Sequence, residues 1–264
     1  MRFTIVVPWV REGQIEDFLR AWGVDSAAPP EWLILMHDKE KRGCAATKNA
    51  GVDAAMERDA EVVVLLDDDC FPHGEVRTLE ALAEAHVAAL EPVQVPLFRA
   101  VTTPPSRGTP YMNRTVEKPV AASMGFWAEV GDYDAARQLA FGSAPMAFDR
   151  TPVFGQYFPL CAMNLAFRPQ RWQPWCRLID VPRFDDIWMG WFWQREAYRR
   201  GYCFNLAGPV VRHSRQSDPF RNLEVEARHL RANETLWARI AAHPSGQYGD
   251  LLALLPQDAG GSDR

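Results

Sequence analysis

The sequence predicts an α/β fold in which helices flank a central, mostly parallel sheet. Two observations support this. Short apolar runs at residues 3–7, 32–36 and 62–66 have the length of buried strands. Segments with helical periodicity alternate with these runs, which is typical of βαβ units. We therefore expect the first 70 residues to form a nucleotide-binding type of half-domain.

The first two helices are predicted from apolar residues that recur on one face. In the first helix these are Ile15, Phe18, Leu19 and Trp22; in the second, Ala45, Val52 and Met56 share one face with Asn49. Gly51 inside the second helix costs about 1 kcal/mol relative to Ala, so we expect close packing there.

The remaining chain is predicted to complete a single domain over residues 1–255. A third helix is expected over about 76–90, then a strand at 93–98 whose Pro96 favours an edge or a bulge. The segment from about 102 to 159 is irregular and is expected to be functional. We assign 1–100 to a nucleotide-binding half, 101–222 to a sugar and acceptor half, 223–243 to a C-terminal helix and 256–264 to a disordered tail.

Composition excludes several classes of protein. Twenty-nine basic and 34 acidic residues give a net charge of −5, so duplex nucleic acid is an unfavourable partner. Five cysteines without a C-x-x-C pair are interpreted as reduced core thiols. We expect a cytoplasmic protein without a membrane span, since there is neither a signal-peptide pattern nor a run of 18 apolar residues. A homo-oligomer remains open.

Three consecutive acids, Asp67, Asp68 and Asp69, follow the third predicted strand directly. Ligands of open α/β sheets bind beyond the carboxyl ends of the strands. Crowded carboxylates repel unless a cation lies between them, and oxygen ligands suit Mg²⁺ or Mn²⁺. The alternative is a helix cap with solvated turn residues. We favour a site for a metal and a nucleotide.

A second acidic pair, Asp185 and Asp186, opens a predicted helix that ends at Gly201. Helix capping needs only one of the two, so the other is free to bind sugar hydroxyls or to stabilise a cationic sugar centre. Four aromatic residues cover this helix, and most are expected in the core while one could form the floor of a sugar site. They are Trp188, Trp191, Phe192 and Trp193.

His213 follows another strand-like segment and lies between Arg212 and Arg215 in the sequence. A neutral imidazole can complete an oxygen-rich metal sphere, and arginines suit phosphate. A structural or exposed histidine is the equally weighted alternative. The residues alone leave this choice open.

Several blocks resemble one family. "DDDCF" is similar to its D-D-D-C-F motif, "VGDYDAARQL" to P-D-Y-D-A-P-T-Q-L, "FPLCAMNLAF" to F-P-M-C-G-M-N-L-A-F, "FDDIWMGW" to Y-D-D-M-W-A-G-W and "RHSRQSDPFRNL" to H-S-K-A-S-N-P-F-x-N-L. In this order they resemble a glycosyltransferase of the GT-A fold, and more closely the reversibly glycosylated polypeptides, whose plant members include UDP-arabinopyranose mutases.

The resemblance implies roles for individual residues. Asp67 would contact the nucleotide ribose or base side, and Asp68 would support it. Asp69 would bind Mn²⁺ or Mg²⁺ on the diphosphate, and His213 would complete the metal sphere. The pair at 185 and 186 would face the donor sugar. Arg114, in "PYMNRTVEKPV", matches the position of the arginine on which the family glycosylates itself.

The N-terminal third resembles ordinary family-two glycosyltransferases instead. Its segment "GCAATKNAGVDAA" places Lys48 and Asn49 where they could approach the nucleotide, and Pro8 ends the first strand nearby. A helix of small residues packed tightly on the sheet explains the alanines equally well. Arg212 and Arg215 are the candidates for the phosphates.

The resemblance implies a metal-dependent enzyme of UDP-sugars. Our leading hypothesis is a UDP-arabinopyranose mutase that interconverts pyranose and furanose forms and glycosylates itself. One alternative is a glycosyltransferase that moves the sugar to a separate small molecule, glycan or nucleobase acceptor. Another is a non-catalytic nucleotide-sugar-binding subunit, against which the set of acids and His213 counts.

Overall fold

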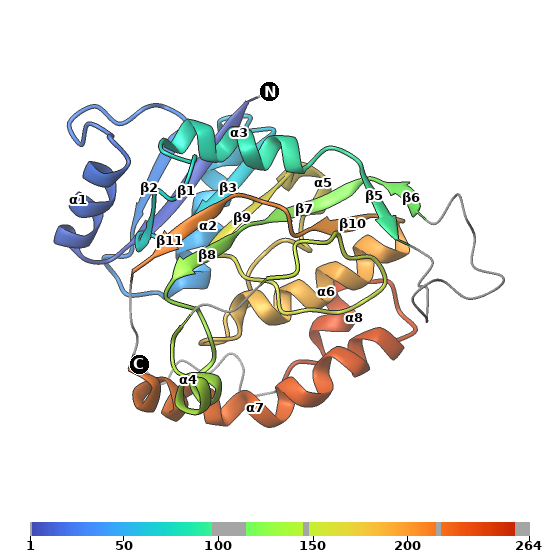
Figure 1. Ribbon diagram of the computed structural model, residues 1–264. Coiled ribbons are helices and arrows are strands. Elements are labelled where there is room, and N and C mark those ends of the chain that lie inside the picture. Colours follow the sequence, from blue (N-terminus) through green and yellow to red (C-terminus); the bar gives the residue numbers. More distant parts are fainter. Residues whose placement is uncertain (1, 97–114, 145–147, 215–217, 257–264) are drawn as a thin grey trace, which may run out of the picture.

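The computed structural model describes residues 2–96, 115–144, 148–214 and 218–256. Its centre is a six-stranded sheet in the order β10-β7-β9-β3-β1-β2 (Figure 1). The bounds of these strands are β1 Phe3–Trp9, β2 Leu33–His37, β3 Val62–Leu66, β7 Val120–Met124, β9 Asn164–Phe167 and β10 Cys203–Asn205.

Five of the six strands run in the same direction. β2 and β3 pair with β1 in parallel, and β10 pairs with β7 in parallel, whereas β9 is antiparallel to both β3 and β7. Strands from both predicted halves share this sheet, and helices lie on its two faces. The predicted α/β architecture with a mostly parallel central sheet is confirmed.

Two smaller sheets accompany the central one. The first has the order β4-β11-β8, with β4 at Cys70–Phe71, β8 at Phe126–Glu129 and β11 at Val210–His213. The second pairs β5 (Val93–Pro96) with β6 (Thr115–Lys118), so the edge position expected for Pro96 is confirmed. The segment expected to be irregular therefore contains β6, β7 and β8. Its strands are short, and β7 is buried throughout, so no alternating pattern marks it.

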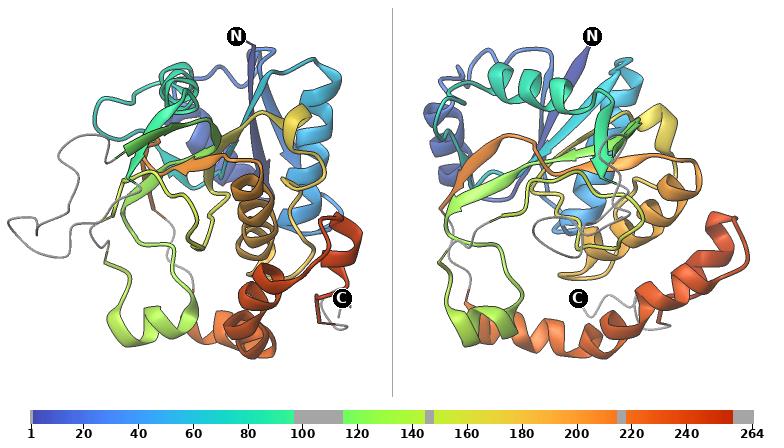
Figure 2. Two further views of the ribbon diagram at one scale, coloured as in Figure 1. Left: turned by 90° about the vertical axis from the view of Figure 1, so that its right-hand side faces the viewer. Right: turned by 45° about the vertical axis from the view of Figure 1, so that its right-hand side comes forward.

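Helices cover both faces of the central sheet. α1 (Glu12–Ala21) and α3 (Leu79–Ala89) lie on one face, and α2 (Cys44–Glu57), α5 (Pro169–Trp172) and α6 (Asp185–Arg199) lie on the other (Figures 1 and 2). α4 (Ala135–Phe141), α7 (Pro219–Ala242) and α8 (Tyr248–Leu252) complete the fold below them. None of the helices in the described residues is long and apolar enough to cross a membrane.

The first strand is longer than predicted. β1 continues through Pro8 to Trp9, and Pro8 is in register with Met36 of β2. The Ile5 N–H donates to the Trp32 carbonyl, on the β2 side of β1. The N–H groups of successive strand residues point to opposite sides, so the nitrogen of Pro8, which carries no hydrogen, faces β3. β3 pairs with β1 only as far as Val6. Proline therefore removes no ladder hydrogen bond, and it does not end the strand.

Side-chain packing settles three further predictions. A Cβ added to Gly51 would overlap Val6 of β1, which confirms the close approach of α2 to the sheet. The four aromatics of α6 are each at most 6% exposed, so all belong to the core and none is available as a sugar floor. Cys70, Cys176 and Cys203 are buried, but Cys44 is exposed, so the interpretation as core thiols is wrong for Cys44.

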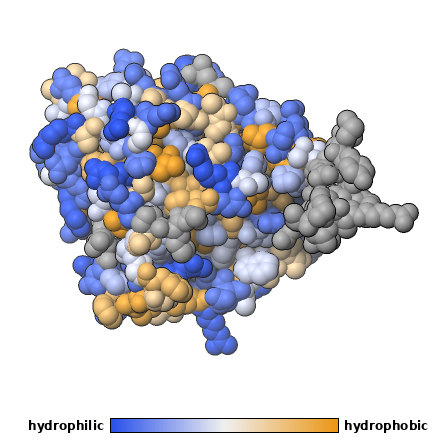
Figure 3. All heavy atoms as spheres, viewed as in Figure 1, coloured by the Kyte–Doolittle hydropathy of each residue, from blue (hydrophilic) through white to orange (hydrophobic). Residues whose placement is uncertain are grey.

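The C-terminal helix begins four residues earlier than predicted. The Asp218 carboxylate accepts hydrogen bonds from the N–H groups of Phe220 and Arg221, and Pro219 occupies the first helical position. Exposed apolar side chains gather over α4 and the start of α7 (Figure 3). They include Leu139, Phe141, Phe220 and Val225.

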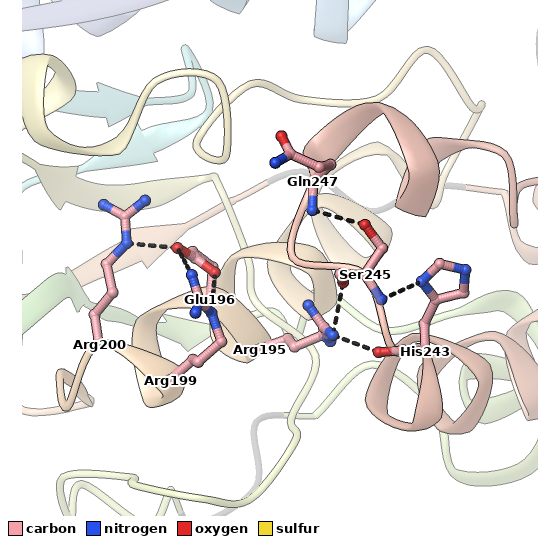
Figure 4. Close-up of polar contacts among 7 residues, drawn as sticks. All are labelled: Arg195, Glu196, Arg199, Arg200, His243, Ser245 and Gln247. Atoms are coloured by element: carbon pink, nitrogen blue, oxygen red, sulfur yellow. Dashed lines mark hydrogen bonds and ion pairs between the residues drawn. The ribbon is translucent and has the colours of Figure 1, made fainter.

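The end of α6 fixes the turn that follows α7. Arg195 donates to the carbonyl oxygens of His243 and Ser245 (Figure 4). The buried Glu196 forms ion pairs with Arg199 and Arg200 one turn further on. The contacts of Arg195 attach the segment after α7 to α6, whereas the ion pairs of Glu196 join residues at the end of α6 to one another.

Candidate functional site

The three consecutive acids form the turn that leaves β3. The Asp67 N–H donates to the Met163 carbonyl (3.0 Å), and the Cys70 N–H donates back to the Asp67 carbonyl (3.1 Å). A cavity of about 340 Å³ opens over this turn. Its lining includes Pro8, Trp9, Gln14, Lys41, Gly43, Cys44, Thr47 and the three acids. A cavity therefore lies at the carboxyl edge of the sheet, where the sequence predicted a binding site.

Lys48 supplies a buried positive charge beside this turn. Its ammonium lies 2.6 Å from Asp67 Oδ1 and donates to the Ala162 carbonyl at 3.1 Å, while only 3% of the side chain is exposed. Burial by itself lowers the pKa of this amine, but the charge and hydrogen bond of Asp67, together with the charges of Cys44 and Asp185, raise the pKa well above its usual value. Lys48 therefore remains protonated and offsets one of the carboxylates.

Asn49 has a different environment. Its side-chain amide donates to the Leu178 carbonyl and accepts from the Leu178 N–H, both at 2.9 Å. It does not line the cavity over the acids. Its placement supports a role in holding the chain before α6 and gives no support to the predicted nucleotide contact.

Asp69 and His213 meet across the small sheet. β11 pairs antiparallel with β4, which puts His213 opposite Cys70 and its Nε2 3.5 Å from Asp69 Oδ2. The His213 Nδ1 lies 3.0 Å from the Val130 carbonyl. That carbonyl can only accept, so Nδ1 carries the proton and the Nε2 lone pair of a neutral ring points toward Asp69.

This pair fits a divalent cation. A histidine that ligates a metal usually donates its other N–H to a carbonyl, as the Nδ1 does here. One carboxylate and one imidazole suit Mn²⁺ better than Mg²⁺, which prefers oxygen alone. Within the described part of the chain, no group of three or more His, Cys, Asp or Glu side chains could hold a metal ion. A cation bound by this pair therefore needs further ligands from water or substrate.

Asp68 and Arg212 do not join the pair formed by Asp69 and His213. Asp68 Oδ1 accepts a hydrogen bond from Gln14 of α1 at 2.8 Å, at the rim of the cavity. Arg212 precedes His213 and so points to the opposite face of β11, where it lies over the Phe71 ring and 3.7 Å from Glu129. This placement gives no support to a phosphate contact by Arg212. Arg114 and Arg215 lie outside the described residues.

Asp185 and Asp186 begin α6 beside Lys48. The Ala162 N–H donates to Asp186 Oδ2 at 2.8 Å. Burial raises the pKa of Asp185 to about 6, with Lys48 opposing this change. Burial and the charge of Asp185 raise the pKa of Asp186 to about 7. Near pH 7 the pair is therefore partly protonated, so that one carboxyl group can donate a proton and the other can accept one.

Three residues of this region were missed by the sequence analysis. Asp132 accepts a hydrogen bond from the Cys161 thiol at 3.7 Å, and its charge acts on Asp186. Its signal was present, because it lies inside "VGDYDAARQL". Trp9 and Thr47 line the cavity, and their Nε1 and Oγ1 atoms are buried without a hydrogen-bond partner among the described residues. No spacing rule identifies such atoms before the fold is known.

Comparison with known proteins gives one family. The family model described as "Reversibly glycosylated polypeptide" matches residues 55–238. A probable UDP-arabinopyranose mutase 1 of Pisum sativum is 32% identical over 190 residues, which cover 62% of this chain and 50% of the relative. A probable UDP-arabinopyranose mutase 4 of Arabidopsis thaliana is 27% identical over 223 residues, which cover 74% of this chain and 59% of the relative.

The chain spans about half the length of the curated relatives it matches. Among solved structures, it is similar to a mannosyltransferase from Pyrobaculum calidifontis in complex with GDP-Man and Mn²⁺, with 16% identity and a TM-score of 0.37. That match covers 96% of this chain and 78% of the other.

Proposed function

The chain belongs to the reversibly glycosylated polypeptide family, and from this premise we propose that it is a metal-dependent enzyme of UDP-sugars. The reaction we favour interconverts the pyranose and furanose forms of UDP-arabinose. The observation that carries the proposal is the arrangement of two acidic groups around Lys48. Asp67 and Asp69 line the cavity, and Asp185 and Asp186, whose pKa values are raised, lie close enough to Lys48 for its charge to act on them.

The cavity over the acids would bind the nucleotide. The Trp9 ring stacks on His37 with 3.7 Å between ring centroids and an interplanar angle of 13°, so its indole is held as a flat wall beside the cavity. Aromatic faces of this kind bind nucleobases by stacking. The buried Trp9 Nε1 would donate a hydrogen bond to the nucleotide, and the Thr47 hydroxyl would donate or accept one.

Asp69 and His213 would hold Mn²⁺ or Mg²⁺. The cation would neutralise negative charge on the diphosphate when the bond to the sugar breaks. Because the described residues offer only this pair, diphosphate oxygens are the natural further ligands. Metal binding and nucleotide binding are therefore expected to be cooperative.

The acids at the start of α6 would act on the sugar. When the bond from the anomeric carbon to UDP breaks, UDP keeps the electron pair and the sugar becomes positively charged, which a carboxylate stabilises. Exchange of ring size then needs a proton delivered to one sugar oxygen and removed from another. The raised pKa values of Asp185 and Asp186 leave the pair partly protonated near neutral pH, so it is suited to both transfers. UDP finally re-forms the bond.

Incubation of the purified protein with UDP-arabinopyranose and Mn²⁺ tests this proposal. Chromatography should show UDP-arabinofuranose, and its formation should stop when the metal is chelated. UDP release that requires an added acceptor would indicate a glycosyltransferase instead. Absence of UDP binding with and without metal would refute every form of the proposal.

Self-glycosylation on Arg114 remains part of the proposal on the strength of the sequence resemblance alone. Intact-mass measurement after incubation with the same UDP-sugar would show the added pentose. The Arg114→Lys protein should lose that mass increase, and its retention in the variant would exclude Arg114 as the attachment residue.

A further inference from the structure

Glu226 of α7 joins two separate segments of the site. Its carboxylate is almost completely buried, with 2% of the side chain exposed. Oε2 accepts a hydrogen bond from the N–H of Ala135, the first residue of α4, at 2.7 Å. Oε1 accepts from Nε of Arg183, in the loop before α6, at 2.9 Å. One buried side chain thus holds the starts of two helices.

Arg183 has an unusual backbone conformation at this junction. Its φ is 68°, in the left-handed region that residues other than glycine rarely occupy. Such a conformation persists only where surrounding contacts impose it, and it is concentrated at functional sites. The guanidinium also donates to the Tyr133 carbonyl at 3.5 Å. Arg183 therefore contacts both of the segments that Glu226 joins.

Each segment carries acids of the proposed sugar side. Asp132 lies three residues before Ala135, and Asp185 lies two residues after Arg183. Burial opposes the charge of Arg183, but Glu226, Asp132 and Asp186 together raise the pKa of its guanidinium. The charged guanidinium of Arg183 thus interacts with these acids while it is hydrogen-bonded to Glu226.

The first segment also reaches the proposed metal side. Val130, two residues before Asp132, accepts the hydrogen bond of His213 Nδ1. A displacement of the turn between β8 and α4 would therefore move both Asp132 and the Val130 carbonyl that orients the His213 ring. Glu226 lies outside the residues that line the nucleotide cavity.

We propose that Glu226 and Arg183 form a clamp that positions Asp132, Asp185 and Asp186 for the reaction on the sugar. The inference rests on the proposed function, and it assigns both members as positioning residues, since neither is placed at a reacting atom. The clamp connects α7 to the site, so the C-terminal helix becomes part of the catalytic apparatus rather than a surface covering.

Glu226→Gln is the central variant. Glutamine keeps the size of the side chain, but its single carbonyl oxygen cannot accept from Ala135 and Arg183 in the way that two carboxylate oxygens do. Arg183→Asn removes the guanidinium with a residue that tolerates a positive φ. Arg183→Lys keeps the charge. Glu224→Gln, on an exposed position of the same helix, is the matched control.

Kinetics with UDP-arabinopyranose and Mn²⁺ separate positioning from a purely structural role. Misplaced catalytic groups lower kcat far more than substrate binding. We expect kcat to fall at least about tenfold in Glu226→Gln and Arg183→Asn, with KM and the Kd of UDP within about threefold of wild type. Arg183→Lys should recover part of kcat, and Glu224→Gln should match wild type. A Glu226→Gln protein with wild-type kcat would overturn the clamp, as would parallel losses of kcat, UDP binding and thermal stability.

Hydrogen exchange provides a measurement that does not depend on turnover. In Glu226→Gln, amides of residues 128–137 and 179–190 should exchange faster, while those of 62–71 should be unchanged. Unchanged exchange in the first two segments would refute the clamp even if the enzyme is active. A wild-type protein that binds UDP but converts no UDP-arabinose would refute the proposed function, and the exchange data would then still decide whether the clamp exists.

Discussion

The two sides of the candidate site are built in different ways. On the nucleotide side, Asp67 and Asp69 directly follow a central strand, and their partners Lys48 and His213 come from a helix and a strand. On the sugar side, the acids lie in a turn and at a helix start. There they depend on the Ala162 N–H and on contacts made by α7. Regular elements position the first side, and long-range contacts position the second.

The electrostatic balance of the two sides also differs. Asp67 has the charged ammonium of Lys48 at 2.6 Å, and Asp69 has the imidazole of His213 at 3.5 Å. Burial is the largest cause of the raised pKa values at 185 and 186, and the charge of Asp185 adds to it at Asp186. Burial raises the pKa of Asp67 as well, but the charge of Lys48 opposes this at a direct contact. The two sides thus differ in their direct partners and not in the direction in which burial moves the pKa.

Loss of the metal-side carboxylate should have the largest effect. Asp69→Ala should weaken UDP binding in the presence of Mn²⁺ by at least about 100-fold, because His213 alone is a poor site for a hard cation. Isothermal titration calorimetry with and without Mn²⁺ measures this. Asp17→Ala, on the exposed face of α1, is the control. Metal-dependent UDP binding that survives in Asp69→Ala would remove the difference between the two sides.

Removal of the buried ammonium should mainly affect folding. Lys48→Met leaves Asp67 buried beside an apolar chain and should lower the free energy of unfolding by about 2 kcal/mol. This is below the usual cost of breaking a buried pair because 27% of the Asp67 side chain is exposed. Urea unfolding at pH 7 measures this decrease in the free energy of unfolding. Adding Asp67→Asn should restore part of it, and the absence of any recovery would show that the two side chains are not coupled.

On the sugar side, loss of a charged group should raise the free energy of unfolding instead of lowering it. Asp186 has a folded pKa of about 7, above the value of 3.8 for an unperturbed aspartate, so its ionisation destabilises the fold as the pH rises through 7. Asp186→Asn can keep the hydrogen bond from Ala162 through its amide oxygen. The variant should be about 1 kcal/mol more stable than wild type at pH 8 and gain little at pH 4, while losing turnover.

Urea unfolding at both pH values checks this prediction, with Asp180→Asn in the preceding loop as the control. Equal stability of the Asp186→Asn and wild-type proteins at pH 8 would mean that the carboxyl group is not under electrostatic strain. The contrast between the two sides would then be one of geometry alone.

Much of the nucleotide side could be predicted from the sequence. Buried strands followed by acids identify the end of β3, and parallel strands bring such ends to one edge. The partners were harder to find. Lys48 was expected near the nucleotide, but its pairing with Asp67 depends on how α2 packs against β3. Asp69 and His213 are 144 positions apart in the sequence, and they meet only because β4 pairs with β11.

The sugar side was predictable only in part. Asp185 and Asp186 stood out as a pair at a helix start, but Asp132 lay in a segment without periodicity and was missed. Glu226 shares a helical face with Leu223 and Leu230, but nothing local in the sequence shows which groups its carboxylate meets. Its burial follows from where α7 crosses α4 and the loop before α6, which is decided by packing and not by local pattern.

By itself, the sequence determined the α/β architecture, the acidic turn after β3 and the family resemblance, because each of these depends on residues that are close together in the chain. The tertiary structure decided which charges are paired, which proton is shared and which helix holds the acids in place. Those properties depend on burial and on distances of a few ångströms between residues far apart in sequence, and only the folded chain sets both.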